Sequence, residues 1–180
     1  MKHKALITAL FLSIILFSCK NEEKKETPKE EEKPLIFDVS LELKIKRDDD
    51  LILYYKDGSN EWIVEEKAVW YSVKGNENFQ RVVFNLPEGI IPNDFRFDIG
   101  RNEFKNQEPI EIKSFTMKYL DKSFTINQDQ FDLFFKPNQY IKYDGKTKQY
   151  SFKKDENGNY DPFFETKPVF YQQLTNLISK

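Results

Sequence analysis

The sequence predicts an all-β protein built as an antiparallel β-sandwich. Short segments alternate between apolar and polar residues, turn residues separate these segments, and no long amphipathic helical pattern interrupts them. Two sheets packed face to face would bury one apolar face of each. Residues 35–180 are long enough for one domain with a real core, so we expect a single sandwich over this range.

The alternation is clearest in the first expected strand, where every second residue from 35 to 45 is apolar. Side chains of a strand point to opposite faces in turn, so this pattern places one face in the core and one toward water. Further strands are expected at 51–55, 62–64, 68–73, 82–86, 95–99, 110–119, 140–143 and 149–152. A shift of phase near Ser114 predicts a β-bulge, Asp144-Gly145 predicts a hairpin, and 128–135 a short helical turn.

The composition fits this class and argues against one kind of partner. The chain has 17 Phe, 9 Tyr and 2 Trp, and a formal net charge of −2. Aromatic residues favour strands, whereas a nucleic-acid partner would require a basic surface. We therefore expect no nucleic-acid binding.

The first 18 residues have the pattern of a secretory signal peptide. A head with two lysines precedes the apolar run 5–17, and the small Ser18 stands directly before Cys19. The alternative is a transmembrane helix, but spanning a bilayer takes about 20 apolar residues and this run is shorter. We expect cleavage between Ser18 and Cys19.

Leu16, Phe17, Ser18 and Cys19 resemble the lipobox of bacterial lipoproteins. The resemblance implies that Cys19 becomes the mature N-terminus, carries a diacylglyceryl group and is acylated on its amine, so that membrane lipid is a partner. Several acyl chains make a stable anchor where one would be marginal. The alternatives are a spare thiol or half of a disulfide, and the chain holds no second cysteine.

Residues 19–34 form the expected link between lipid and domain. They mix lysine and glutamate with almost no apolar residue, a composition that predicts a flexible tether. Lys20-Asn21-Glu22-Glu23 resembles the signal that follows the lipidated cysteine in surface-exposed lipoproteins of the Bacteroidota. The expected location is the outer membrane of a bacterial envelope, with display on the cell surface favoured.

A second resemblance concerns the domain. VKGNENFQRVVFNLPEGIIPNDFRFDIGRN (73–102), followed by IEIKSFTMKYLDKSFTI (110–126), resembles jelly-roll domains of the carbohydrate-binding type appended to bacterial envelope proteins. This resemblance implies a jelly-roll-like topology, and it does not choose between a glycan and an envelope protein as the partner.

The chemistry open to the mature chain is narrow. His3 is the only histidine and would leave with the signal peptide, and Cys19 would be capped by lipid. This excludes Ser-His-Asp and Cys-His nucleophile systems and zinc sites made of histidine or cysteine. Paired carboxylates such as Asp98 and Glu111 would suffice for a glycosidase, the alternative being solvated charges on strand faces.

Two acidic clusters are candidates for calcium, which prefers oxygen ligands. Asp155, Asn157, Asn159 and Asp161 alternate oxygen side chains as in a calcium loop, but Gly158 is misplaced and no closing glutamate follows. The other cluster is the aspartate run 48–50. The alternative for each is a polar turn, and no other cofactor is expected.

Aromatic residues supply the candidate ligand-binding set, Trp62, Trp70 and Tyr71, because a flat ring can stack on a sugar. Trp70 stands in an apolar run, which predicts a core position, whereas Trp62 beside a turn is the better surface candidate. The expected function is a non-catalytic binding or accessory module for a glycan or an envelope protein. The alternative is a small carboxylate-dependent glycoside hydrolase.

Overall fold

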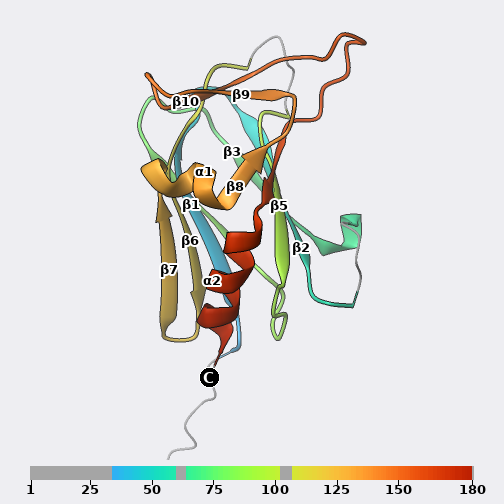
Figure 1. Cartoon of the computed structure of the whole chain (residues 1–180), viewed down its shortest axis with the longest axis vertical. Coiled ribbons are helices and arrows are strands. Elements are labelled where there is room, and N and C mark those ends of the chain that lie inside the picture. The colour runs from blue at the N-terminus through green and yellow to red at the C-terminus, as the bar shows by residue number, and fades with distance from the viewer. Residues whose placement is uncertain (1–33, 60–63, 102–106, 180) are drawn as a thin grey trace, which may run out of the picture. The chain divides into compact units, whose positions relative to one another are not determined.

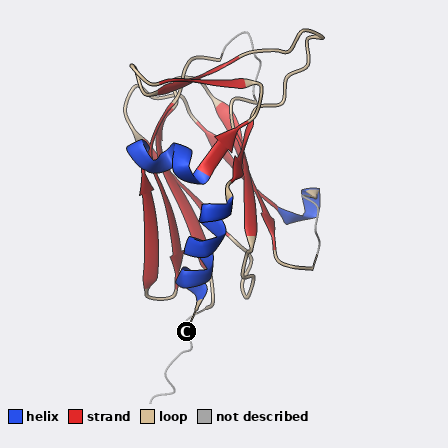
Figure 2. Ribbon diagram, viewed as in Figure 1, coloured by secondary structure: helices blue, strands red, loops and turns tan. Residues whose placement is uncertain are grey.

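The computed structural model describes residues 34–59, 64–101 and 107–179. Two antiparallel sheets pack against each other and confirm the β-sandwich (Figures 1 and 2). Sheet A has the strand order β4-β1-β6-β7, and sheet B the order β3-β2-β5-β11-β8. The chain crosses between the two sheets repeatedly. No helix within the described ranges has the length and apolar character to span a membrane.

The elements have the following bounds: β1 Phe37–Lys44, β2 Asp49–Lys56, η1 Glu65–Lys67, β3 Ala68–Val73, β4 Gln80–Asn85, β5 Asp94–Asp98, β6 Glu111–Tyr119, β7 Lys122–Asn127, η3 Gln128–Gln130, α1 Phe131–Phe134, β8 Phe135–Pro137, β9 Ile141–Asp144, β10 Gln149–Phe152, β11 Phe163–Thr166 and α2 Pro168–Ile178. The hairpin β9-β10 crosses the upper end of the sandwich in Figure 1. A bridge between Ile110 and Tyr150 ties this hairpin to the start of β6.

Sheet A follows the predicted alternation. Every second side chain of β1 is fully buried, beginning with Phe37, while its polar neighbours face outward. The register between β1 and β6 shifts after Glu42, which pairs with Ser114, because Leu43 pairs with Ile112. Lys113 is therefore the extra residue of a β-bulge, as the phase of the sequence predicts.

In sheet B, strand β2 is buried on both of its faces. Leu51, Leu53 and Tyr55 of β2 face the core, yet Ile52 and Tyr54 on the opposite face are also buried. The reason is that β2 lies between β3 and β5, whose outward side chains flank these two residues. The outer face of this sheet is therefore a packed surface in its own right.

Phenylalanine rings fill the space between the sheets, and α2 closes this core. Phe170 of α2 lies 5.8 Å from Phe95, 6.1 Å from Phe115 and 5.4 Å from Phe135, measured between ring centroids. Such tilted and edge-on contacts add about 0.5–1.5 kcal/mol per pair to the area that the rings bury. Leu174 and Leu177 continue the same buried stripe.

The structure corrects one expectation about local structure and describes only one residue of another. The sequence predicts no sizeable helix, but α2 has eleven residues, with Phe170, Leu174 and Leu177 at helical spacing. Of the strand expected at 62–64, residues 62 and 63 lie outside the described residues, and Val64 is not in a strand. The hairpin at Asp144-Gly145 and the helical turn near residue 130 are confirmed.

Candidate functional site

The structure describes only some of the residues that the sequence singles out. Ser18, Cys19 and Trp62 lie outside the described residues. The lipid attachment and the surface role of Trp62 therefore stay predictions.

Trp70 is an exposed aromatic residue on β3. Its side chain points out of sheet B and is 52% exposed, so the expected core position is wrong. Val69 and Val73, on the opposite face of β3, pack against the core, whereas Tyr71 between them is 37% exposed. Tyr71 contacts the core ring of Phe84 at 6.1 Å and points away from the face that carries Trp70. Trp70 and Tyr71 therefore do not form one aromatic surface.

Around Trp70 the strands of sheet B bring together side chains that are distant in sequence. Across the sheet, Trp70 pairs with Ile52, Ile52 with Asp98, and Asp98 with Phe163. The next row pairs Tyr54 with Arg96 and Arg96 with Glu165. We call this surface the B face; it consists of Ile52, Tyr54, Trp70, Arg96, Asp98, Phe163 and Glu165.

Arg96 is the centre of the B face. Its Nε and Nη2 donate hydrogen bonds to Asp98 at 2.7 and 2.9 Å, and Nη2 reaches Asp161 at 3.1 Å. The guanidinium also lies 3.7 Å from the ring centroid of Phe163. Burial nevertheless raises the pKa of Asp98, although Arg96 acts to lower it. The two residues form a fixed ion pair beneath the exposed residues of this face.

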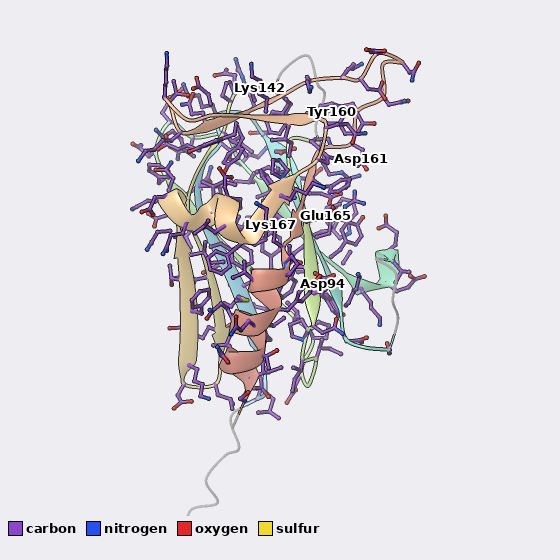
Figure 3. All side chains as sticks on the ribbon, in the orientation of Figure 1. Asp94, Lys142, Tyr160, Asp161, Glu165 and Lys167 are labelled. Atoms are coloured by element: carbon purple, nitrogen blue, oxygen red, sulfur yellow. The ribbon has the colours of Figure 1, made fainter. Side chains whose placement is uncertain are left out.

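Figure 3 shows where the acidic residues lie relative to this centre. Asp161 and Glu165 follow one another along the segment that contains β11, and Asp94 lies further down at the start of β5. Asp94 is paired with Lys56 at 2.9 Å. Acidic and basic side chains therefore alternate on this face, and Asp94, Asp98 and Asp161 are each paired with a cation.

Tyr54 and Arg101 complete the surroundings of Trp70. The Tyr54 hydroxyl donates to Glu65 at 3.0 Å, and the guanidinium of Arg101 lies 5.0 Å from the centre of the Trp70 ring. Burial, then the hydrogen bond to Glu65, raises the pKa of Tyr54 to about 12. Trp70 and Arg101, both exposed, together present an aromatic ring and a cation to solvent.

The two carboxylates proposed for hydrolysis do not lie together. Asp98 points out of sheet B and is buried under Arg96, with 2% of its side chain exposed. Glu111 lies at the start of β6, where it pairs with Lys44 of the neighbouring strand at 3.1 Å on the outer face of sheet A. The whole sandwich separates the two groups, so Asp98 and Glu111 cannot flank one glycosidic bond.

The two aspartates of the candidate calcium loop use their carboxylate oxygens for other contacts. Asp155 accepts hydrogen bonds from the backbone of Asn157 at 3.0 Å and of Asn159 at 2.7 Å, and from the Asn159 amide at 2.9 Å. These bonds lower the pKa of Asp155. Asp161 turns instead toward Arg96. The four residues form a self-capped turn with one outward ion pair.

The aspartate run at the start of β2 is also divided. Asp48 pairs with Lys74, Asp49 accepts from the backbone N–H of Gly100 at 2.5 Å, and Asp50 accepts from the Ser72 hydroxyl at 2.6 Å. Over the ranges 34–59, 64–101 and 107–179, no three His, Cys, Asp or Glu side chains are grouped so that they could hold a metal ion.

The outer face of sheet A differs from the B face. It carries short polar side chains, such as Thr116 and Thr125, whose hydroxyls lie 2.9 Å apart, and exposed pairs such as Lys113 with Glu42. Its aromatic ring is that of Phe79, directly before β4, which is only partly exposed and lies 4.9 Å from the Lys44 ammonium and 5.5 Å from the Lys113 ammonium, whereas the B face carries an exposed indole. Of the two sheet faces, the B face is therefore the candidate for recognition.

Sequence reasoning missed Arg96, Tyr54, Phe163 and Arg101. The sequence contains a signal for Arg96, because the alternation Phe95-Arg96-Phe97-Asp98 places Arg96 and Asp98 on one strand face, two residues apart. Phe163 comes from β11, far along the chain from β5, and no local pattern pairs it with Arg96.

Comparisons with protein-family models, with curated proteins and with solved structures find no match.

Proposed function

We propose that this chain is a non-catalytic binding module of a bacterial envelope, anchored through lipid on Cys19, and that the B face binds a glycan. The observation that carries the proposal is the exposed indole of Trp70 with the guanidinium of Arg101 beside it. An aromatic ring offers flat apolar area to the C–H face of a sugar, and a guanidinium donates hydrogen bonds to its oxygens.

The rigidity beneath Trp70 supports a binding role. Ile52, next to Trp70 across the sheet, is fully buried, and the Arg96–Asp98 pair holds the neighbouring row in place. A surface that is already ordered loses little conformational entropy when it binds a ligand. Side chains on strands are also held more precisely than side chains on loops.

A protein partner is the second candidate, favoured by the same pair. Tryptophan and arginine are enriched among the few residues that contribute most of the binding energy of protein interfaces. The hydrolase alternative has no comparable support, since Asp98 and Glu111 lie on opposite outer faces and each is ion-paired.

A glycan array probed with the detergent-solubilised full chain tests the proposal. We expect binding to at least one glycan class, and a loss of at least about tenfold in affinity for Trp70→Ala. Val83→Ala is the control, because Val83 is an exposed apolar residue of β4 on the outer face of sheet A, away from the B face. Equal losses in both variants, or no glycan bound, would contradict the glycan assignment. A stoichiometric protein captured by the parent and lost in Trp70→Ala would support the protein partner.

The anchor has its own test. Cys19→Ser should move the protein from the membrane fraction to the soluble fraction, because it removes the only site of acylation that the lipobox-like sequence offers. A variant that stays as firmly membrane-bound as the parent would show that the anchor lies elsewhere.

A further inference from the structure

One end of the sandwich exposes apolar side chains from three separate segments. Leu35 before β1, Ile91 between β4 and β5, and Leu120 between β6 and β7 are 46%, 42% and 53% exposed. Figure 1 shows these segments and the end of α2 at the lower end of the domain. We call this surface the Leu120 pole; it consists of Pro34, Leu35, Ile36, Ile91, Leu120 and Ile178.

These residues are neighbours in space. One depression of about 570 Å³ is lined by Pro34, Ile36 and Leu120, among others, and a second of about 330 Å³ is lined by Ile91, Leu120 and Ile178. A hydrogen bond of 2.9 Å from the Gly89 N–H to the Leu35 carbonyl links the segments further. Leu120 borders both depressions and is the centre of the patch.

Leu120 occupies a position that does not suit leucine. It is the first residue of the two-residue turn between β6 and β7, and its φ is 55°. Glycine or asparagine adopts this left-handed conformation readily, whereas a bulky residue there is an outlier. The leucine gains little burial in the domain to offset the strain, because more than half of its side chain is exposed. A surface outside the domain would supply that burial.

The charges that line the two depressions cancel. Lys118 and Lys122 lie beside Asp38 and Asp121, and Lys122 is already bonded to the carbonyl of Ser179. The attraction of this surface is therefore apolar rather than electrostatic. A partner that offers apolar area without fixed complementary charge fits it.

We propose that the Leu120 pole contacts the lipid bilayer, with Leu35, Ile91 and Leu120 inserted at the interface. The inference rests on the proposed lipid anchor: Pro34 at this pole is fifteen positions after Cys19, a distance of at most about 50 Å in extended chain. The anchor keeps the pole at a high effective concentration near lipid, so even weak insertion is populated. The B face extends along the side of the sandwich and stays open to its ligand.

The test uses the full chain reconstituted in phosphatidylcholine vesicles. Lipidation blocks Cys19, so an environment-sensitive fluorophore on Leu120→Cys labels a single site. We expect a blue-shifted emission that is quenched by lipids brominated on their acyl chains and is insensitive to salt. Leu133→Cys is the matched control: Leu133 is 61% exposed but follows β7, which leads about 17 Å away from the pole. Its probe should remain unquenched.

A second pair of variants tests the role of the side chain itself. Leu120→Asn suits the left-handed turn and should fold at least as well as the parent, but it should reduce quenching of a probe at Ile91→Cys. Leu133→Asn should leave that quenching unchanged. Equal quenching at residues 120 and 133, or a shielded probe at 120 that brominated lipid does not reach, would overturn the inference. Labelling of the parent chain by the fluorophore would show that Cys19 is not lipidated, and either that result or failure of the parent to float with vesicles would refute the lipid anchor. The quenching of the probe at residue 120, measured as the difference from the parent, still decides whether the pole contacts lipid.

Discussion

Replacing Arg96 by methionine should destabilise the domain strongly at neutral pH, because it leaves the Asp98 carboxylate buried without its partner. Asp98 is 2% exposed and accepts two hydrogen bonds from Arg96, at 2.7 and 2.9 Å. Breaking a buried pair by removing one member costs about 3–5 kcal/mol. Lys113→Met is the control, since Lys113 pairs with Glu42 at the same 2.7 Å but the two are 54% and 38% exposed. Its cost should stay below about 1 kcal/mol.

The pH dependence sharpens this prediction. Arg96 acts to lower the pKa of Asp98, which burial already raises, so its removal raises that pKa further. A carboxyl group whose pKa is higher in the folded than in the unfolded state favours folding as the pH falls. The deficit of Arg96→Met should therefore shrink on acidification toward about pH 4, by at most about 1.4 kcal/mol per pH unit.

Urea denaturation of parent and variants at several pH values measures these free energies of unfolding. Adding Asp98→Asn to Arg96→Met should recover part of the loss at neutral pH, because the double variant buries no unpaired charge. A deficit that does not change between neutral and acidic pH, or one no larger than that of Lys113→Met, would refute the role of Arg96 as the partner of a buried charge.

Three further predictions concern stability and titration. Gly100→Ala should cost more stability than Gly89→Ala in the same denaturation assay. Both glycines have a positive φ, 73° and 81°, but only at Gly100 would the new methyl group meet a ring, at 2.5 Å from Phe152. Equal costs would contradict this contact. Glu65→Ala removes the acceptor of the Tyr54 hydroxyl, so it should lower the pKa of Tyr54 from about 12 but leave it above its ordinary value of 10.0, since burial is the larger cause. Ultraviolet titration of the phenol measures this pKa, and an unchanged value would contradict the hydrogen bond. A chain that starts at residue 35 should fold alone, and a far-ultraviolet circular dichroism spectrum dominated by helix would contradict the independence of the sandwich.

The sheets were predictable where burial is one-sided. In β1 each apolar residue alternates with a polar one, so the strand and its inward face follow from the sequence alone. The bulge at Lys113 was predictable for the same reason, because it reverses that alternation. Helix α2 was not predicted, because three buried positions over eleven residues, with polar residues between them, give only a weak amphipathic pattern.

The B face was harder to predict, because its properties depend on what covers each side chain. Trp70 stands in the apolar run 68–73, which does not reveal that β3 is the edge strand of sheet B. In the sequence, Asp98 cannot be distinguished from an exposed charge on a strand. Its burial follows from the pairing of β5 with β11, which places Arg96 and Phe163 over it. Such contacts depend on tertiary pairing between distant segments, and one sequence contains no local pattern for them.

The position of α2 has a consequence for how the protein folds. Phe170 packs against rings from β5, β6 and β8, and every strand precedes this helix in the chain. The core therefore stays open until residues 168–178 follow the strands and pack against them, and contacts of such long range form slowly. The strands alone would therefore leave the rings of Phe95, Phe115 and Phe135 without their common partner until this helix docks.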